Sequence, residues 1–181
     1  KEQKFVFDTG YMGQLMVPSD SKIDLDIYNK MELEGSLFVA ATSVTQGLET
    51  LYEKVPVVLA GQSFLSKPVV SQTVKVKLLG IQFIKGFDWI IDYKNNKVYA
   101  KRNHIKIEDT FNRKVSYYAK ADEKLTVAVK EKKQTQYQLG DEIVSVNGQK
   151  ATPENNCELQ NLLNRTDDWS TLNLEVVPVA K

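Results

Sequence analysis

Short apolar segments separated by turn residues occupy the first hundred positions of the chain. Segments of this kind, rich in β-branched and aromatic residues, are typical of β-strands. We expect strands at residues 5–7, 14–17, 36–44, 51–59 and 69–79. This pattern predicts a mainly β fold for the N-terminal part of the chain.

A tight hairpin and one short helix complete this part. Residues 89–93 and 97–101 flank Asn95 and Asn96, and asparagine tolerates the positive φ angle that a two-residue turn requires. Residues 82–86 predict a short helix. Residues 19–33 are polar with spaced apolar positions, a pattern that leaves a helix and an irregular loop both open.

The pattern changes after a polar segment at residues 104–111, which we interpret as a linker. We therefore expect one domain at residues 1–103 and another at residues 112–181. Strands of the second domain are expected at residues 124–130, 142–146 and 171–177. Thr152 and Pro153 predict a helix start, because Thr can cap a helix and Pro suits its first position. An apolar stripe at i, i+3 and i+4 follows, formed by Leu159, Leu162 and Leu163.

Charge and cysteine content argue against several functions. The 24 Lys and Arg residues nearly balance the 23 Asp and Glu residues, so we predict no nucleic-acid partner. The single cysteine, Cys157, excludes an internal disulfide and a cysteine-based metal cluster. Cys157 and the single histidine, His104, lack a recognisable catalytic context, and we expect Cys157 to be a small buried residue of the helix. We predict no metal and no cofactor.

A carboxylate directly follows the first apolar segment, in the order Asp8, Thr9, Gly10. Gly10 permits a sharp loop whose N–H groups can hydrogen-bond the carboxylate, and Thr9 can fix the loop through its hydroxyl. We interpret Asp8 as a rigidly held carboxylate on an apolar floor. The triplet alone also occurs at ordinary strand-to-turn junctions, so its meaning depends on the rest of the chain.

A carboxylate of this kind suits aspartic-protease chemistry, which needs two carboxylates that share one proton. Like charges a few ångströms apart cannot both ionise, so their pKa values separate. The ionised partner then activates water, and the protonated partner donates to the scissile carbonyl oxygen. The chain has no second Asp-Thr-Gly, and we interpret Asp88 and Asp92 as ordinary strand residues. The second carboxylate is therefore expected from outside this chain.

Two motifs, in order, resemble those of the retropepsin-like aspartic proteases. Residues 8–18 resemble the prokaryotic branch, in which an aromatic residue and a further Gly follow the triplet. The Leu-Leu-Gly run that ends at Gly80 resembles the second signature of the family. The hairpin at residues 87–100 is similar to the one that closes these lobes in envelope proteases of Bacteroidetes-type bacteria. The resemblance covers residues 1–103.

This resemblance implies an aspartic-type endopeptidase lobe in which Asp8 is catalytic and Thr9 and Gly10 orient it. It implies a peptide or protein substrate and a location in the bacterial cell envelope or periplasm. It also implies a second Asp-Thr-Gly lobe, supplied by the same parent polypeptide or by a homodimer mate. Tyr11 departs from the family pattern, which often has Ala, Ser or Thr at this position. Only seven residues precede Asp8, so we expect the opening hairpin of the lobe to be missing or to lie upstream.

Residues 139–148 resemble the core of a PDZ domain, in which a Gly-Asp turn leads into a buried strand that ends in Asn-Gly. The resemblance covers residues 112–178 and implies a small β domain with one main helix. In that family a peptide adds as an extra strand. Here the groove is expected between residues 124–130 and 155–163. Its peptide-binding residues are expected to be Lys124, Leu125, Val127, Leu159 and Leu163.

The role of this second domain stays open at this point. No glycine marks the family's carboxylate-binding loop at residues 112–117, which argues against capture of a free C terminus. A module that only positions the protease lobe is the alternative, and it predicts a covered edge at residues 125–129. For the whole chain, the alternative function is a catalytically silent scaffold with a PDZ-type interaction module.

Overall fold

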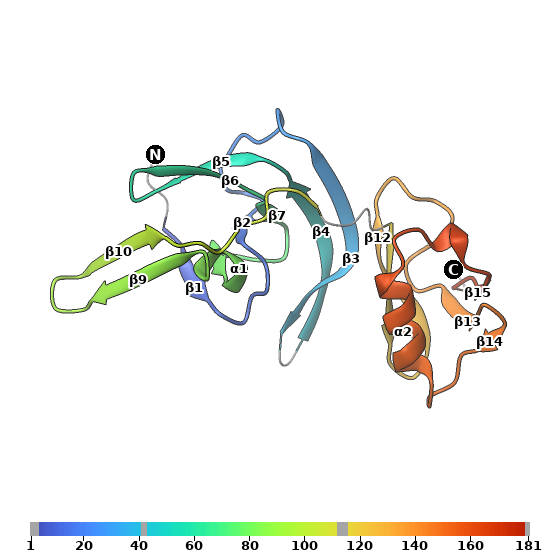
Figure 1. Cartoon of the computed structure of the whole chain (residues 1–181). Helices are drawn as coiled ribbons and strands as arrows, with labels where there is room; N and C mark the ends of the chain where they lie inside the picture. Colours follow the sequence, from blue (N-terminus) through green and yellow to red (C-terminus); the bar gives the residue numbers. More distant parts are fainter. Residues whose placement is uncertain (1–3, 41–42, 112–115, 180–181) are drawn as a thin grey trace. The chain divides into compact units, whose positions relative to one another are not determined.

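The computed structural model describes residues 4–40, 43–111 and 116–179 (Figure 1). It is mainly β, with 45% of residues in strands and 10% in helices, which confirms the expected fold class at this level. The chain divides into a first unit, Lys1–Met31 with Glu49–Phe111, and a second unit, Glu32–Leu48 with Asn112–Lys181. We call Glu32–Leu48 the inserted segment, because it belongs to the second unit although the flanking sequence belongs to the first.

A small mixed sheet forms the centre of the first unit. Its strands lie in the order β1 (Val6–Asp8), β8 (Leu78–Gly80), β2 (Leu15–Pro18), β7 (Val69–Ser71) and the part of β4 (Ser43–Tyr52) that begins at Glu49. Strands β1 and β8 run parallel, and β2 is antiparallel to β8 but parallel to β7. This order places the end of β1 beside the end of β8, although about 70 residues separate them in sequence.

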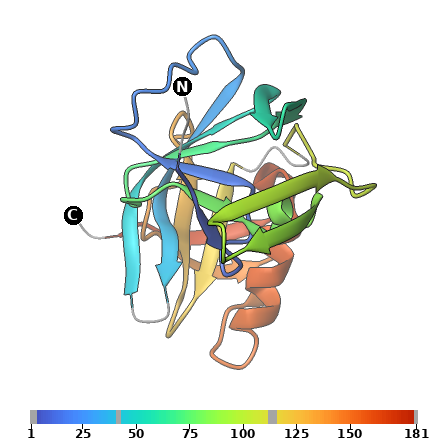
Figure 2. The ribbon, with the colours of Figure 1, turned by 90° about the vertical axis from the view of Figure 1, so that its left-hand side faces the viewer.

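Two hairpins and a short helix complete the first unit. The hairpins are β5 (Val55–Leu59) with β6 (Gln62–Ser66) and β9 (Phe87–Asp92) with β10 (Lys97–Arg102), and the helix is α1 (Ile81–Ile84). Figure 1 shows the β9–β10 hairpin reaching away from the sheet, and in Figure 2 the hairpin points toward the viewer. Asn96 has a φ of 52°, as the predicted turn requires, but the turn has four residues, 93–96, rather than two, because Asp92 pairs with Lys97. Helix α1 confirms the predicted short helix. The core contains Leu15, Leu79, Phe83, Phe87 and Ile107.

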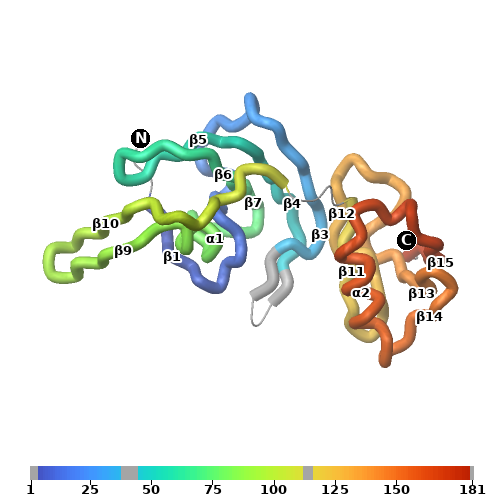
Figure 3. Tube along the Cα trace, in the orientation of Figure 1, coloured from blue at the N-terminus to red at the C-terminus, as the bar shows by residue number. Residues whose placement is uncertain are grey.

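The second unit packs one helix against antiparallel strands (Figure 3). The helix is α2 (Asn156–Arg165), and the strands are β3 (Lys30–Ala40), β11 (Tyr117–Ala121), β12 (Leu125–Glu131), β13 (Glu142–Val146), β14 (Gln149–Lys150) and β15 (Leu174–Val177). A helix and a final strand are present as expected, but their bounds differ. Helix α2 begins at Asn156 after Asn155, not at Thr152 and Pro153, and β15 is shorter than the strand expected at 171–177 because residues 169–171 form a 3-10 helix. Among the described residues, no helix has both the length and the apolar character needed to cross a membrane. The core contains Tyr117, Ala119, Leu125, Val127, Ile143, Val146, Leu159, Leu163 and Trp169.

Strand boundaries differ from the sequence expectation in several places. The expected strand at 36–44 is divided between β3 and β4, whose connection at 41–42 lies outside the described residues. The expected strand at 51–59 is interrupted at Lys54, where φ is 55°. The expected strand at 69–79 is two strands, because the Ser71 hydroxyl accepts the Thr73 N–H and turns the chain after β7. Residues 19–29 form an irregular loop rather than a helix.

Candidate functional site

Asp8 ends strand β1 with one carboxylate oxygen fixed by the loop that follows. Its Oδ1 accepts the Gly10 N–H at 2.9 Å and the Tyr11 N–H at 3.2 Å. The side chain is half-buried, and no described residue hydrogen-bonds the other oxygen, Oδ2. The predicted loop is therefore present, and it presents a carboxylate with one oxygen held and one available.

Strand β8 crosses beside this loop and fixes its shape. The register places Asp8 opposite Gly80, and the Gly80 N–H donates to the Gln14 carbonyl at 2.6 Å. The Ile81 N–H donates to the Tyr11 carbonyl at 2.8 Å. A methyl group at position 80 would overlap the Gly13 carbonyl oxygen, so only glycine fits where the two segments cross. The structure thus brings the two sequence motifs together.

Tyr11 fills the space that two glycines leave beside the loop. A side chain at Gly13 would overlap the Tyr11 ring, and so would one at Gly80. Burial raises the pKa of the Tyr11 phenol, and the nearby Glu49 carboxylate raises it further, so the phenol stays neutral. Tyr11 therefore supports the loop by packing.

Thr9 is exposed, and its hydroxyl hydrogen-bonds no described residue. Gly10 contributes the N–H that holds Oδ1. In this structure the backbone therefore supports Asp8, and the orienting role of the Thr9 hydroxyl stays a prediction.

Glu49 is a buried acid that the sequence analysis did not single out. Its side chain is 7% exposed, and its Oε1 accepts the Ser71 hydroxyl at 3.3 Å. Burial raises the pKa of Glu49 to about 7, against the opposing effect of the Ser71 hydrogen bond. The sequence carried no signal for it, because a glutamate in an expected β region normally lies on the solvent face.

The two other acids that we considered have structural roles, as expected. Asp92 is the last residue of β9, and its carboxylate accepts both the backbone and the side-chain N–H groups of Asn95. These bonds lower the pKa of Asp92. Asp88 lies within β9 and accepts the Asn103 side-chain amide at 3.3 Å.

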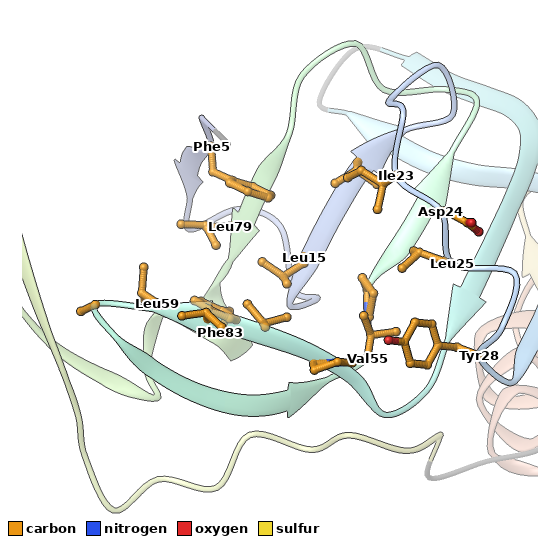
Figure 4. A pocket seen from close by; sticks show the side chains of 16 residues that line it. Phe5, Leu15, Ile23, Asp24, Leu25, Tyr28, Val55, Leu59, Leu79 and Phe83 are labelled. Atoms are coloured by element: carbon orange, nitrogen blue, oxygen red, sulfur yellow. The ribbon is translucent and has the colours of Figure 1, made fainter. Parts of the chain in front are cut away.

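An apolar pocket of about 820 Å³ lies in the same unit (Figure 4). Leu79 lines it, and in β8 this residue directly precedes Gly80, the partner of Asp8. Figure 4 shows Leu15 and Phe83 at the same part of the pocket, and Asp24 and Tyr28 at its other part. The pocket can accept an apolar group of side-chain size or larger.

Four of the five predicted peptide-binding residues lie in the core of the second unit. Leu125, Val127 and Leu159 are 1% exposed, and Leu163 is 0% exposed. They pack against one another, so in this structure they cannot line an open groove. Only Lys124 is exposed, and its Nζ lies 2.5 Å from a carboxylate oxygen of Glu142.

The strand edge that we expected at residues 125–129 is covered. One edge of β12 pairs with β11, in a register from Tyr117 opposite Lys130 to Ala121 opposite Leu125. On its other edge, Thr126 pairs with β13, and residues 129–131 pair with β3. A free edge for strand addition is therefore not found at β12, which is an interior strand.

Helix α2 closes the outer edge of β11 with side-chain amides. The Ala119 N–H donates to Asn164 Oδ1 at 2.8 Å, and the Ala119 carbonyl accepts from Asn164 Nδ2 at 3.0 Å. Gln160 Nε2 also donates to this carbonyl, at 3.3 Å. One side chain thus reproduces both hydrogen bonds that an added strand would make at this residue.

The expectation of a buried Cys157 is wrong. The thiol is exposed, because α2 turns Asn156, Leu159 and Leu163 inward and leaves position 157 on the outer face. The described residues contain no cluster of three or more His, Cys, Asp or Glu side chains that could hold a metal ion.

Comparisons of the chain with protein-family models, with curated proteins and with solved structures found no match. The functional assignment therefore depends on the geometry of the two units.

Proposed function

We propose that the first unit is one retropepsin-like lobe of an aspartic peptidase and that Asp8 is one of its two catalytic carboxylates. One observation carries this proposal. A half-buried carboxylate ends a strand, accepts two loop N–H groups and lies opposite a glycine of the crossing strand. A carboxylate fixed in this way is pre-positioned for proton transfer, which is what peptide hydrolysis by an acid pair requires.

In this proposal Asp8 shares one proton with the aspartate of a second lobe. The pair titrates as a unit, so either carboxylate can be the base that activates water. The other donates its proton to the carbonyl oxygen of the scissile peptide bond. The second lobe comes from the parent polypeptide or from a second copy of this chain, and the enzyme acts in a bacterial cell envelope.

The apolar pocket supports a peptide substrate with an apolar side chain near the scissile bond. Leu79 connects the pocket to the strand that fixes the Asp8 loop. Substrate side chains that enter such pockets supply binding energy and orientation for the reacting bond.

For the second unit, the closed edges favour the positioning role over peptide capture. Strand β12 is paired on both edges, and Asn164 occupies the backbone groups of Ala119. We therefore propose a PDZ-type module that binds its own chain in this state. A catalytically silent scaffold remains the second candidate function, since one carboxylate alone cannot act as both acid and base.

Hydrolysis of a peptide library at pH 4–5 tests the catalytic proposal. The assembly that contains the second carboxylate is compared with its Asp8→Asn variant. We expect Asp8→Asn to lower the rate by about 10²- to 10⁴-fold, because the side chain keeps its shape but loses its role in proton transfer. Asp92→Asn is the matched control, since Asp92 only holds a hairpin turn. Full activity in Asp8→Asn would reject the proposal, and inactivity of every assembly would favour the scaffold.

A further inference from the structure

The inserted segment is the strand partner of β12 within the second unit. Gly35 pairs with Val129, Glu34 with Lys130 and Leu33 with Glu131. One further bond extends the pairing, because the Lys132 N–H donates to the Glu32 carbonyl at 2.9 Å. This contact joins two stretches of chain that about 100 residues separate, so the fold must select it among other strands.

A buried cation recognises the acidic face of this segment. Lys130 has a side chain only 8% exposed, and its Nζ lies 2.9 Å from Glu34 Oε1. The same Nζ donates to the Gln134 carbonyl at 2.9 Å. A buried lysine is costly unless a carboxylate and further acceptors compensate it, and here Glu34 is the only acid paired with it among the described residues.

A second ion pair repeats the charge pattern two residues away. Lys132 Nζ lies 3.5 Å from Glu32 Oε2. This pair lies on the same face of the paired strands as Lys130 and Glu34. Opposite charges on directly facing strand positions stabilise one register over its neighbours. The two pairs therefore define both the partner and its alignment.

Gly35 adds a steric requirement to the charge pattern. It has a φ of 126°, and a methyl group there would overlap the Ala128 carbonyl oxygen. The obstacle is backbone rather than a flexible side chain, so no other residue fits without moving β12. The strand that β12 accepts is therefore defined by two glutamates in alternate positions followed directly by a glycine.

We propose that the edge formed by β12 with Lys130 and by Lys132 just after it is a strand-binding site specific for acidic segments of this kind. Its occupant is the chain's own Glu32–Gly35 stretch. The module thus binds an internal segment by strand addition, at the edge of β12 opposite the one that pairs with β11. This inference concerns the second unit alone and does not depend on catalysis by Asp8.

Amide hydrogen exchange on the full chain tests the proposal. The Lys132 N–H reports docking of the segment, because its acceptor is Glu32. The Asn147 N–H, which donates to the Asn173 carbonyl, reports the rest of the unit. We expect Glu34→Lys to speed exchange at Lys132 by about tenfold or more and to leave Asn147 unchanged. We expect the exchanged pair, Glu34→Lys with Lys130→Glu, to restore most of the protection.

The controls make each outcome decisive. Asp122→Asn breaks the exposed Lys120–Asp122 pair of the same unit and should leave exchange at Lys132 unchanged. Gly35→Ala should release the segment by sterics alone, with the charges intact. Unchanged exchange at Lys132 in Glu34→Lys and Gly35→Ala would overturn the proposal, as would failure of the charge exchange to restore protection. Parallel loss of protection at Lys132 and Asn147 would also overturn it, because the segment would then be an inseparable strand of the fold.

Discussion

The two units differ in how fully the polar groups of their strands are hydrogen-bonded within the chain. In the first unit, backbone N–H groups hold one oxygen of Asp8, while no described residue hydrogen-bonds the other. In the second unit, side chains of the same unit occupy the backbone groups of Ala119, and the inserted segment pairs with β12. A group that is held but incompletely satisfied is suited to act on a ligand. A group that is fully paired within the chain stabilises the fold instead.

Glu49 gives the largest expected effect on stability and tests whether the Asp8 unit is adapted to acidic conditions. In the folded protein, burial raises the pKa of the Glu49 carboxyl to about 7, above its usual value near 4.5. A raised acid pKa means that the folded state binds more protons between these values, so this contribution to stability is full below about pH 4.5 and is lost as pH rises to 7. From the shift, the loss is on the order of 3 kcal/mol.

Urea unfolding between pH 4.5 and 8, followed by NMR at the methyl groups of Leu15 and Leu79, measures this loss. We expect the stability difference between Glu49→Gln and the natural chain to change by the stated amount across this range. Asp20→Asn, at an exposed position of the same unit, should show no such change. A stability difference that is independent of pH would show that Glu49 does not make the stability of the first unit depend on pH.

Local sequence pattern predicted the contacts that depend on a few adjacent residues. The loop after Asp8 and the positive φ of Asn96 are of this kind, whereas α2 begins at Asn156 and not at the predicted Thr152 and Pro153. The assignment of the inserted segment to the second unit could not be read in this way, because it depends on pairing of Glu34 with the distant Lys130.

Which side chains are buried was the second property that the sequence did not predict. Leu125 and Leu159 have the alternation and spacing of both a groove and a core, and only the packing of α2 on β11 distinguishes the two. Asn164 gave no signal, because an amide on a helix normally faces solvent. Glu49 was missed for the same reason.

Gly80 gives the next effect and tests whether the support of Asp8 is steric. Gly80→Ala would place a methyl group against the Gly13 carbonyl and the Tyr11 ring. We expect a loss of about 1–3 kcal/mol in the free energy of unfolding of the first unit, because a crowded backbone crossing has no side chain that can move aside. Val76→Ala, on the exposed connection before β8, is the control.

Changes in the amide resonances of Gly10 and Tyr11 should accompany this loss, since both N–H groups bind Asp8. If Gly80→Ala lowers stability but leaves these two resonances in place, β8 supports the fold without shaping the loop. The first unit would then differ less from the second, because the crossing strand would not be what fixes the Asp8 carboxylate.

Asn164 gives the smallest effect on stability and tests the other half of the contrast. Asn164→Ala removes both amide bonds to Ala119 and leaves its carbonyl with Gln160 alone. We expect a loss of about 1–2 kcal/mol in the second unit, typical of hydrogen bonds removed at a half-buried site. Asn161→Ala, an exposed position on the same helix, should cost less than half of this.

Peptide titration of the same variants shows whether closing this edge prevents strand addition. We expect the natural chain to bind peptides weakly or not at all, and Asn164→Ala to bind them more tightly because the Ala119 N–H becomes free to pair. Peptides with free and amidated C termini should bind equally, since no glycine marks a carboxylate-binding loop at residues 112–117. Tight binding to the natural chain would mean that the amide of Asn164 is displaced easily. The second unit would then resemble the first, because its backbone polar groups at Ala119 would be available to a ligand.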